Sequence, residues 1–180
     1  MKNQTFKNMN KYLIVLFLIA LGFIGRMLPH PANFAPIGAL AIFGGMFLPK
    51  KWNMIIPLSA MFISDLFLGF YSLPIMLSVY LGFAVTGAIG NWLRDRKKLP
   101  YALGGVALGS IVFFFLTNGA VWAFGTLYSH NLSGLLQSYY MGLPFFRNSL
   151  AGDIIYTTVL MMGYEAAMAI AQKLKRPSQI

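Results

Sequence analysis

The chain has no cysteine and few acidic residues. None of its 180 residues is cysteine, and 4 are Asp or Glu against 14 Lys or Arg, for a formal net charge of +10. The missing thiols exclude a disulfide framework, a thiolate metal site and a cysteine nucleophile. Charged residues make up 10% and hydrophobic residues 58%, whereas a soluble domain carries about 25% charged residues. The composition therefore excludes a soluble monomer and a disordered chain.

The positive charges lie between or beyond long apolar runs, and only Arg26 and Arg147 stand apart. A nucleic-acid-binding surface would interleave its cations with Ser, Asn and aromatic side chains along one face. Cations that separate apolar spans are instead typical of membrane proteins, which keep them in the cytoplasm. We therefore expect the lipid bilayer to be a partner of this chain, and we expect no nucleic acid.

Six apolar runs approach or reach the length of about 20 residues that a membrane-spanning helix needs. They lie at about 12–28, 34–49, 54–70, 75–93, 101–124 and 148–170. Leu-Pro pairs, the last at 143–144, lie at or near their boundaries, and proline disfavours a helical conformation in the residue before it. The sequence predicts an all-α, polytopic membrane protein with six transmembrane helices, in which residues 1–180 form a single domain.

An even number of spans places both termini on one side of the membrane. With the N-terminus in the cytoplasm, all cations outside the spans fall inside, as the positive-inside rule requires. They are Lys2, Lys7, Lys11, Lys50, Lys51, Arg94, Arg96, Lys97, Lys98, Lys173, Lys175 and Arg176. No small-x-small cleavage site precedes Arg26, so we expect the first run to be a span and not a cleaved signal peptide. The expected location is the bacterial cytoplasmic (inner) membrane.

The outer ends of the spans carry polar side chains that the inner loops lack. Charged groups at membrane depth are costly, so they usually mark a binding site or a paired partner. We expect an outward-open polar chamber roofed by loops 29–33, 71–74 and 125–147. The candidate substrate-binding residues are Arg26, His30, Asn33, Asp65, Tyr71, Asn118, Trp122, Tyr128, Asn148 and Asp153.

Some of these residues have a structural alternative. An ion pair with Asp65 or Asp153 explains Arg26 as readily as contact with a ligand does. A metal site of His30 with the two aspartates would require three helices to converge. The sequence has no Walker, Gly-x-Ser-x-Gly or His-Glu-x-x-His motif. We therefore expect no enzymatic activity and no cofactor, and any ATPase that drives transport must come from other chains.

Residues 26–45 read RMLPHPANFAPIGALAIFGG, and residues 143–148 read LPFFRN. Together with Ser64-Asp65 and the segment from Thr117 to Trp122, these motifs resemble an uncharacterised family of small six-helix bacterial membrane proteins. The resemblance covers nearly the whole chain. It implies the same six-helix architecture.

A second resemblance is to the S components of energy-coupling-factor vitamin transporters, which share the short helices, internal termini and polar outer face. The solitary vitamin B12 transporters are similar at Arg26, His30, Ala41, Phe43 and Asp65. The resemblance implies an S-component-like bundle that takes up a vitamin-like micronutrient, such as a corrinoid, together with a separate energising ATPase or transmembrane module. Without cysteine, only His30 or His130 could ligate cobalt. The alternatives are a non-transporting scaffold subunit that binds a partner protein, and a membrane-embedded metalloenzyme.

Overall fold

The computed structural model describes the backbone of residues 2–175 and, within that range, the side chains of residues 13–50, 52–170, 172 and 173. All regular structure in this part of the chain is helical, which confirms the predicted all-α class. The predicted inner cations Lys2, Lys7, Lys11, Lys51, Lys175 and Arg176 lie outside the described side chains. The helices are α1 (Lys2–Met27), α2 (Ile37–Phe47), α3 (Lys50–Asn53), α4 (Ile55–Leu68), α5 (Leu73–Trp92), α6 (Leu99–Phe124) and α7 (Leu132–Lys175).

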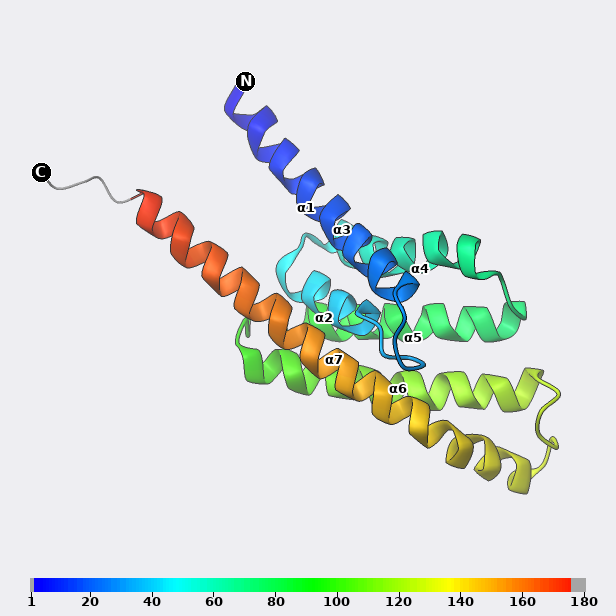
Figure 1. The fold of residues 1–180 in the computed structure, drawn as a ribbon. Coiled ribbons are helices and arrows are strands. Elements are labelled where there is room, and N and C mark those ends of the chain that lie inside the picture. Colours follow the sequence, from blue (N-terminus) through cyan, green and yellow to red (C-terminus); the bar gives the residue numbers. More distant parts are fainter. Residues whose placement is uncertain (1, 176–180) are drawn as a thin grey trace, which may run out of the picture.

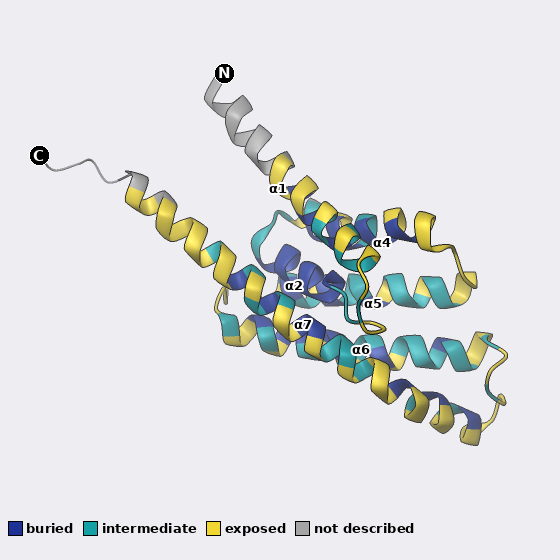
Figure 2. Ribbon diagram, viewed as in Figure 1, coloured by how far each residue is buried: buried dark blue, intermediate teal, exposed yellow. Residues whose placement is uncertain are grey.

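Helices α5 and α6 lie side by side, and the long helix α7 crosses the bundle next to α6 (Figure 1). Helix α2 occupies the centre, where it contacts α5, α7, α4 and α6. Ten of its 11 residues are buried, as the dark blue ribbon in Figure 2 shows. A helix that is apolar on all sides is stable only when it is surrounded, so the composition of α2 explains its central position.

Glycines allow α2 and α5 to approach backbone to backbone. A Cβ atom added to Gly90 of α5 would collide with the Ile42 carbonyl oxygen, and one added to Gly45 of α2 would collide with the Gly87 carbonyl oxygen. Small residues at a helix interface permit such close approach, which increases van der Waals contact. The α2–α5 interface therefore depends on these two glycines having no side chain.

Two of the described helices, α5 and α6, are long and apolar enough to cross a membrane by the criteria of length and composition. The described apolar segment 13–27 of α1, together with α2 and α4, is shorter. Predicted runs 34–49, 54–70, 75–93 and 101–124 correspond to α2, α4, α5 and α6 with shifted ends. The bounds of α2 follow from Pro36 at its start and Leu48-Pro49 at its end, because proline interrupts the helical hydrogen bonding.

The C-terminal helix corrects part of the sequence prediction. Helix α7 continues from Leu132 to Lys175 through Pro144, so the Leu-Pro pair at 143–144 is not a boundary, and 148–170 is only part of the helix. Residues 132–147 are likewise not a loop over the chamber. The prediction failed because it treated every Leu-Pro pair as a helix boundary.

Contacts with α6 explain why the helix continues past this proline. The Ser138 hydroxyl donates to the Asn118 carbonyl oxygen at 2.7 Å, and the Tyr139 hydroxyl donates to the Phe115 carbonyl oxygen at 3.3 Å. An internal proline removes one backbone hydrogen bond and crowds the preceding turn. The tertiary contacts of the first turns of α7 offset that cost.

We predict that Gly90→Ala destabilises the fold, because the new methyl group must displace the backbone of α2. The expected loss is about 1–3 kcal/mol in the free energy of unfolding, as for other overpacked sites. Denaturant unfolding of the purified protein measures it. The matched control is Gly104→Ala, since a Cβ at Gly104 of α6 meets nothing within 4 Å; we expect it to leave stability unchanged or raise it by up to about 1 kcal/mol. Equal losses in both variants would contradict the close packing of α2 against α5.

Candidate functional site

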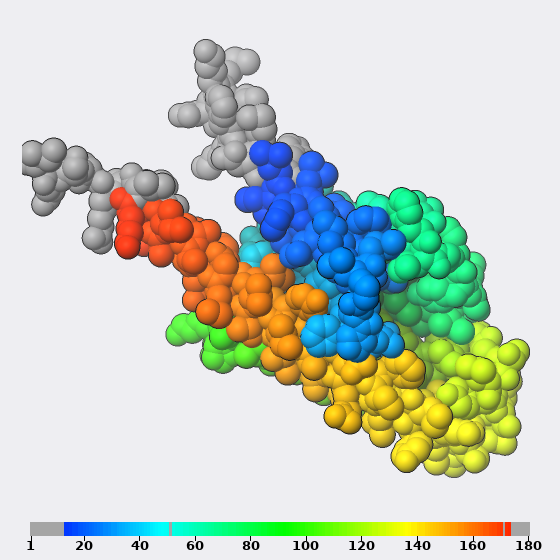
Figure 3. Space-filling model, viewed as in Figure 1, coloured from blue at the N-terminus to red at the C-terminus, as the bar shows by residue number. Residues whose placement is uncertain are grey.

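A cavity of about 520 Å³ lies among α1, the loop 28–36, α5, α6 and α7. Figure 3 shows this loop, in blue, against the middle of α7. Asn33 in the loop has a φ of 64°, a left-handed conformation that Asn adopts more readily than most residues. Seven of the ten candidate residues line the cavity: Arg26, His30, Asn33, Tyr71, Asn118, Tyr128 and Asp153. The structure therefore brings together residues from six separate segments, and we call this cavity the chamber.

The other three candidates lie outside the chamber lining and make structural contacts. Asp65 is 1% exposed and pairs with Arg26. The Trp122 indole nitrogen donates to the Ser129 carbonyl oxygen at 3.0 Å, within the turn between α6 and α7. The Asn148 amide donates to the Ala32 carbonyl oxygen at 3.0 Å, which fastens the loop 28–36 to α7.

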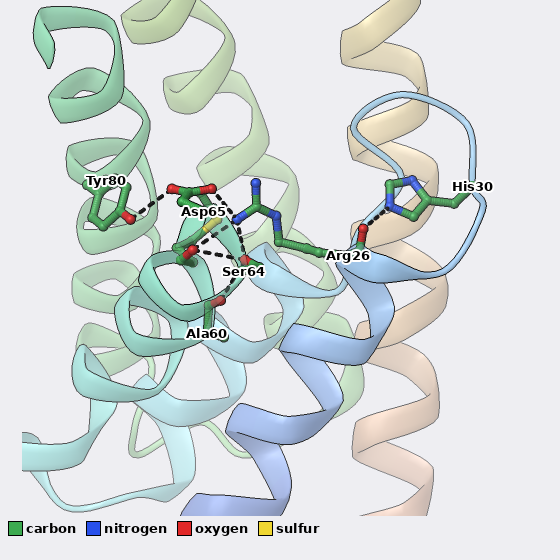
Figure 4. Close-up of polar contacts among 7 residues, drawn as sticks. Arg26, His30, Ala60, Ser64, Asp65 and Tyr80 are labelled. Atoms are coloured by element: carbon green, nitrogen blue, oxygen red, sulfur yellow. Dashed lines mark hydrogen bonds and ion pairs between the residues drawn. The ribbon is translucent and has the colours of Figure 1, made fainter. Parts of the chain in front are cut away.

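Arg26 and Asp65 form an ion pair at the chamber wall (Figure 4). The Arg26 Nη1 atom lies 2.8 Å from Asp65 Oδ1, with side chains 17% and 1% exposed. The same nitrogen donates to the Ser64 hydroxyl at 2.5 Å and to the Met61 carbonyl oxygen at 3.2 Å. Of the two acids that the sequence offered as partners for Arg26, the structure selects Asp65.

Tyr80 completes this ion pair and was missed by the sequence analysis. Its hydroxyl donates to Asp65 Oδ2 at 2.8 Å, so both carboxylate oxygens accept a hydrogen bond (Figure 4). A buried carboxylate needs such donors because it has lost its water. The available signal was a phenol in the middle of the apolar run 75–93, whereas the predicted aromatic candidates all lay at the outer ends of the spans.

Tyr71 lies in the segment between α4 and α5 and lines the chamber beside the ion pair. Burial raises the pKa of the Tyr71 phenol, and the negative charge of Asp65 raises it further, against a smaller opposing effect of Arg26. The phenol therefore stays protonated at neutral pH. It can donate a hydrogen bond to a ligand.

Asp153 of α7 contributes the second carboxylate, and it is 7% exposed. Its Oδ2 atom accepts a hydrogen bond from the Ser110 hydroxyl at 2.6 Å, and the carboxylate also accepts one from the backbone of Ala39. Ala39 lies in the first turn of α2, where backbone N–H groups lack partners within the helix and the dipole favours an anion. A Cβ at Gly38 would collide with this carboxylate, so glycine allows the close contact.

His30 is held by backbone atoms of its own segment. Its Nδ1 lies 2.8 Å from the Pro31 carbonyl oxygen, and its Nε2 lies 3.3 Å from the Arg26 carbonyl oxygen. Among the described residues, no group of three or more His, Asp or Glu side chains could hold a metal ion. The arrangement of His30, Asp65 and Asp153 that a metal site would require is therefore not formed in the part of the chain that the structure describes.

Comparison with known proteins identifies the family to which this chain belongs. A family model described as "Family of unknown function (DUF6580)" matches residues 6–176, so the chain belongs to this family. No curated protein and no solved structure matches the chain.

We predict that Asp65→Asn destabilises the protein, because it leaves the positive charge of Arg26 uncompensated in a partly buried position. Breaking one side of such a pair costs about 3 kcal/mol, which thermal unfolding would detect. The double variant Arg26→Gln/Asp65→Asn removes both charges, so we expect it to be more stable than Asp65→Asn alone.

Tyr80→Phe is the matched control for this experiment, since it removes only the hydrogen bond to Asp65. The expected loss is about 1 kcal/mol. If Asp65→Asn lost no more stability than Tyr80→Phe, the charge pairing of Arg26 with Asp65 would not contribute to the fold.

Proposed function

We propose that this member of the DUF6580 family is a substrate-binding protein of the bacterial cytoplasmic membrane that takes up a small, vitamin-like nutrient through the chamber. The proposal rests on the cavity of about 520 Å³, whose lining combines a majority of apolar residues with polar side chains. Ligand sites typically have volumes of about 300–1,000 Å³ and this mixture of groups. The volume favours a nutrient smaller than a corrinoid.

Exposed apolar side chains support a position inside the bilayer. Phe17 of α1, Phe67 of α4 and Phe115 of α6 are more than half exposed, among many others. Soluble monomers seldom expose large contiguous apolar patches, whereas acyl chains would cover them at no cost. We propose that α1, α2, α4, α5, α6 and α7 together form a six-helix, S-component-like membrane bundle.

The positions of the loops support an orientation in which the chamber opens toward the outside of the cell. In Figure 1 the start of α1, the end of α7 and the loop 93–98 lie at one end of the bundle, and the segments 69–72 and 125–131 lie at the other. The first end carries Arg94, Arg96, Lys97 and Lys98. Positive residues remain in the cytoplasm, so the end with Tyr71 and Tyr128, which line the chamber, would face outward.

The proposed mechanism begins with entry of the nutrient from outside. The loop 28–36 and the segments 69–72 and 125–131 border the chamber and would close over the bound nutrient. The ion pair with Asp65 holds the Arg26 guanidinium at the wall, where it can donate hydrogen bonds to the ligand without bringing an uncompensated charge. A rearrangement of the whole domain, driven by an ATPase module on other chains where one is needed, would then open the chamber inward.

A non-transporting scaffold subunit is the second candidate. Arg26 already has its partner in Asp65, so its charge does not require a ligand. Leu132, Leu136 and Tyr140 are exposed at four-residue spacing on the first turns of α7, which places them on one helix face. In the scaffold function, this apolar face would bind a partner protein.

We predict that a small molecule co-purifies with the gently extracted protein and is lost in Val121→Phe, because the larger side chain would fill the chamber. Val121 of α6 lines the chamber. A penalty of about 1–3 kcal/mol for overpacking corresponds to roughly 5- to 150-fold in affinity. Native mass spectrometry measures the occupancy.

The matched control is Val159→Phe, since Val159 is exposed on α7 and does not line the chamber. We expect it to retain the ligand. A ligand-free wild-type protein with a stoichiometric partner chain in the same spectrum would instead support the scaffold function.

The absence of cysteine provides a direct test of the orientation. Ser129→Cys in the segment between α6 and α7 should react with a membrane-impermeant maleimide in intact cells. Asp95→Cys in the loop between α5 and α6 should react only after the membrane is permeabilised. Both positions are exposed, so reaction of Asp95→Cys in intact cells would contradict the proposed orientation.

A further inference from the structure

We propose that the ligand of the chamber is an organic cation with an apolar body, and that the Asp153 carboxylate is its counter-ion. This inference rests on the proposed function for the existence of a ligand. It goes further by naming the chemical class of that ligand and the residue that recognises its charge.

The chamber wall carries both basic and acidic side chains. The titratable side chains that line the chamber are Arg26, His30, Tyr71, Tyr128 and Asp153. The positive charge of Arg26 is compensated by Asp65 at 2.8 Å, and this is the one ion pair among the described side chains. The balance therefore leaves the carboxylate of Asp153 without a cationic partner.

Asp153 is surrounded by uncharged hydrogen-bond donors. The Ser110 hydroxyl and the Ala39 backbone donate hydrogen bonds to its carboxylate. These groups are dipoles, which stabilise a negative charge but do not neutralise it. Arg147, a nearby cation along α7, is exposed and does not line the chamber. A buried charge is stable when it has a partner of opposite sign, and a cationic ligand supplies one.

Aromatic side chains line the chamber together with this carboxylate. Phe83 and Phe113 both line the chamber, with ring centroids 4.7 Å apart, and Phe113 lies one helical turn from Ser110. Tyr71, Tyr128 and Phe145 add further rings to the wall. Aromatic faces attract cations through the ring quadrupole and also provide apolar contact area. A ligand with an ammonium group at Asp153 and an apolar body against Phe83 and Phe113 would contact both the carboxylate and the aromatic rings.

The test compares three probes of nearly identical shape: 2-phenylethylammonium, the neutral 2-phenylethanol and the anionic phenylacetate. Each is titrated into the full-length protein, and binding is measured from the shift in melting temperature. We expect the wild-type protein to bind the ammonium probe at least about tenfold more tightly than the alcohol, which corresponds to about 1.4 kcal/mol. We expect phenylacetate to bind more weakly than the alcohol.

The variant Asp153→Asn keeps the size of the side chain and removes its charge, so we expect it to abolish the preference for the ammonium probe. The matched control is Glu165→Gln, which makes the same charge change at an exposed position of α7 outside the chamber. We expect Glu165→Gln to retain the preference. If Asp153→Asn does not fold, the comparison of the three probes on the wild-type protein still decides the question.

Several outcomes would overturn the inference. One is wild-type protein that binds the alcohol or phenylacetate as tightly as the ammonium probe, or that binds none of the three. Another is a co-purifying ligand that chemical identification shows to be neutral or anionic, which would leave the proposed binding function intact. A preference for the ammonium probe that survives in Asp153→Asn would remove Asp153 from the role of counter-ion. Failure of the binding function itself is recognised separately, by wild-type protein that carries no small molecule.

Discussion

The ion pair between Arg26 and Asp65 is the interaction on which the site depends. Asp65 is almost completely buried in α4, and its two oxygens accept hydrogen bonds from Arg26 at the end of α1 and from Tyr80 in α5. Because an unpaired charge in a low-dielectric interior is costly, this one group holds three helices together at the chamber wall. The pairing also compensates the charge of Arg26, so Asp153 is the acidic side chain of the chamber lining that forms no ion pair with a described side chain.

A second constraint is the burial of the short helix α2 at the centre of the bundle. Glycines allow its backbone to touch that of α5, and Gly38 in its first turn allows Asp153 of α7 to approach. The same helix therefore forms part of the core and positions the carboxylate that we propose as the counter-ion. The chamber is thus a consequence of the packing around α2, since its polar groups are held by the helices that form the core.

The sequence predicted much of the fold and part of the site, and the misses have physical reasons. The apolar runs predicted α2, α4, α5 and α6 with small shifts, because hydrophobicity and proline act locally along the chain. Pro144 was misassigned because hydrogen bonds to α6, absent from any local pattern, hold the turns that precede it. Tyr80 was missed because a phenol within an apolar run is polar only at its hydroxyl, and Asp65, which accepts its hydrogen bond, lies on another helix.

The sequence by itself determined the all-α class, the apolar character of the helices and the placement of cations outside the apolar runs. Each of these follows from the chemistry of the side chains within a single segment of the chain. Only the tertiary structure decided that Arg26 pairs with Asp65 while Asp153 meets Ser110 and the first turn of α2. Both acids lie at similar depths in the predicted spans, and the pairing depends on which helices become neighbours.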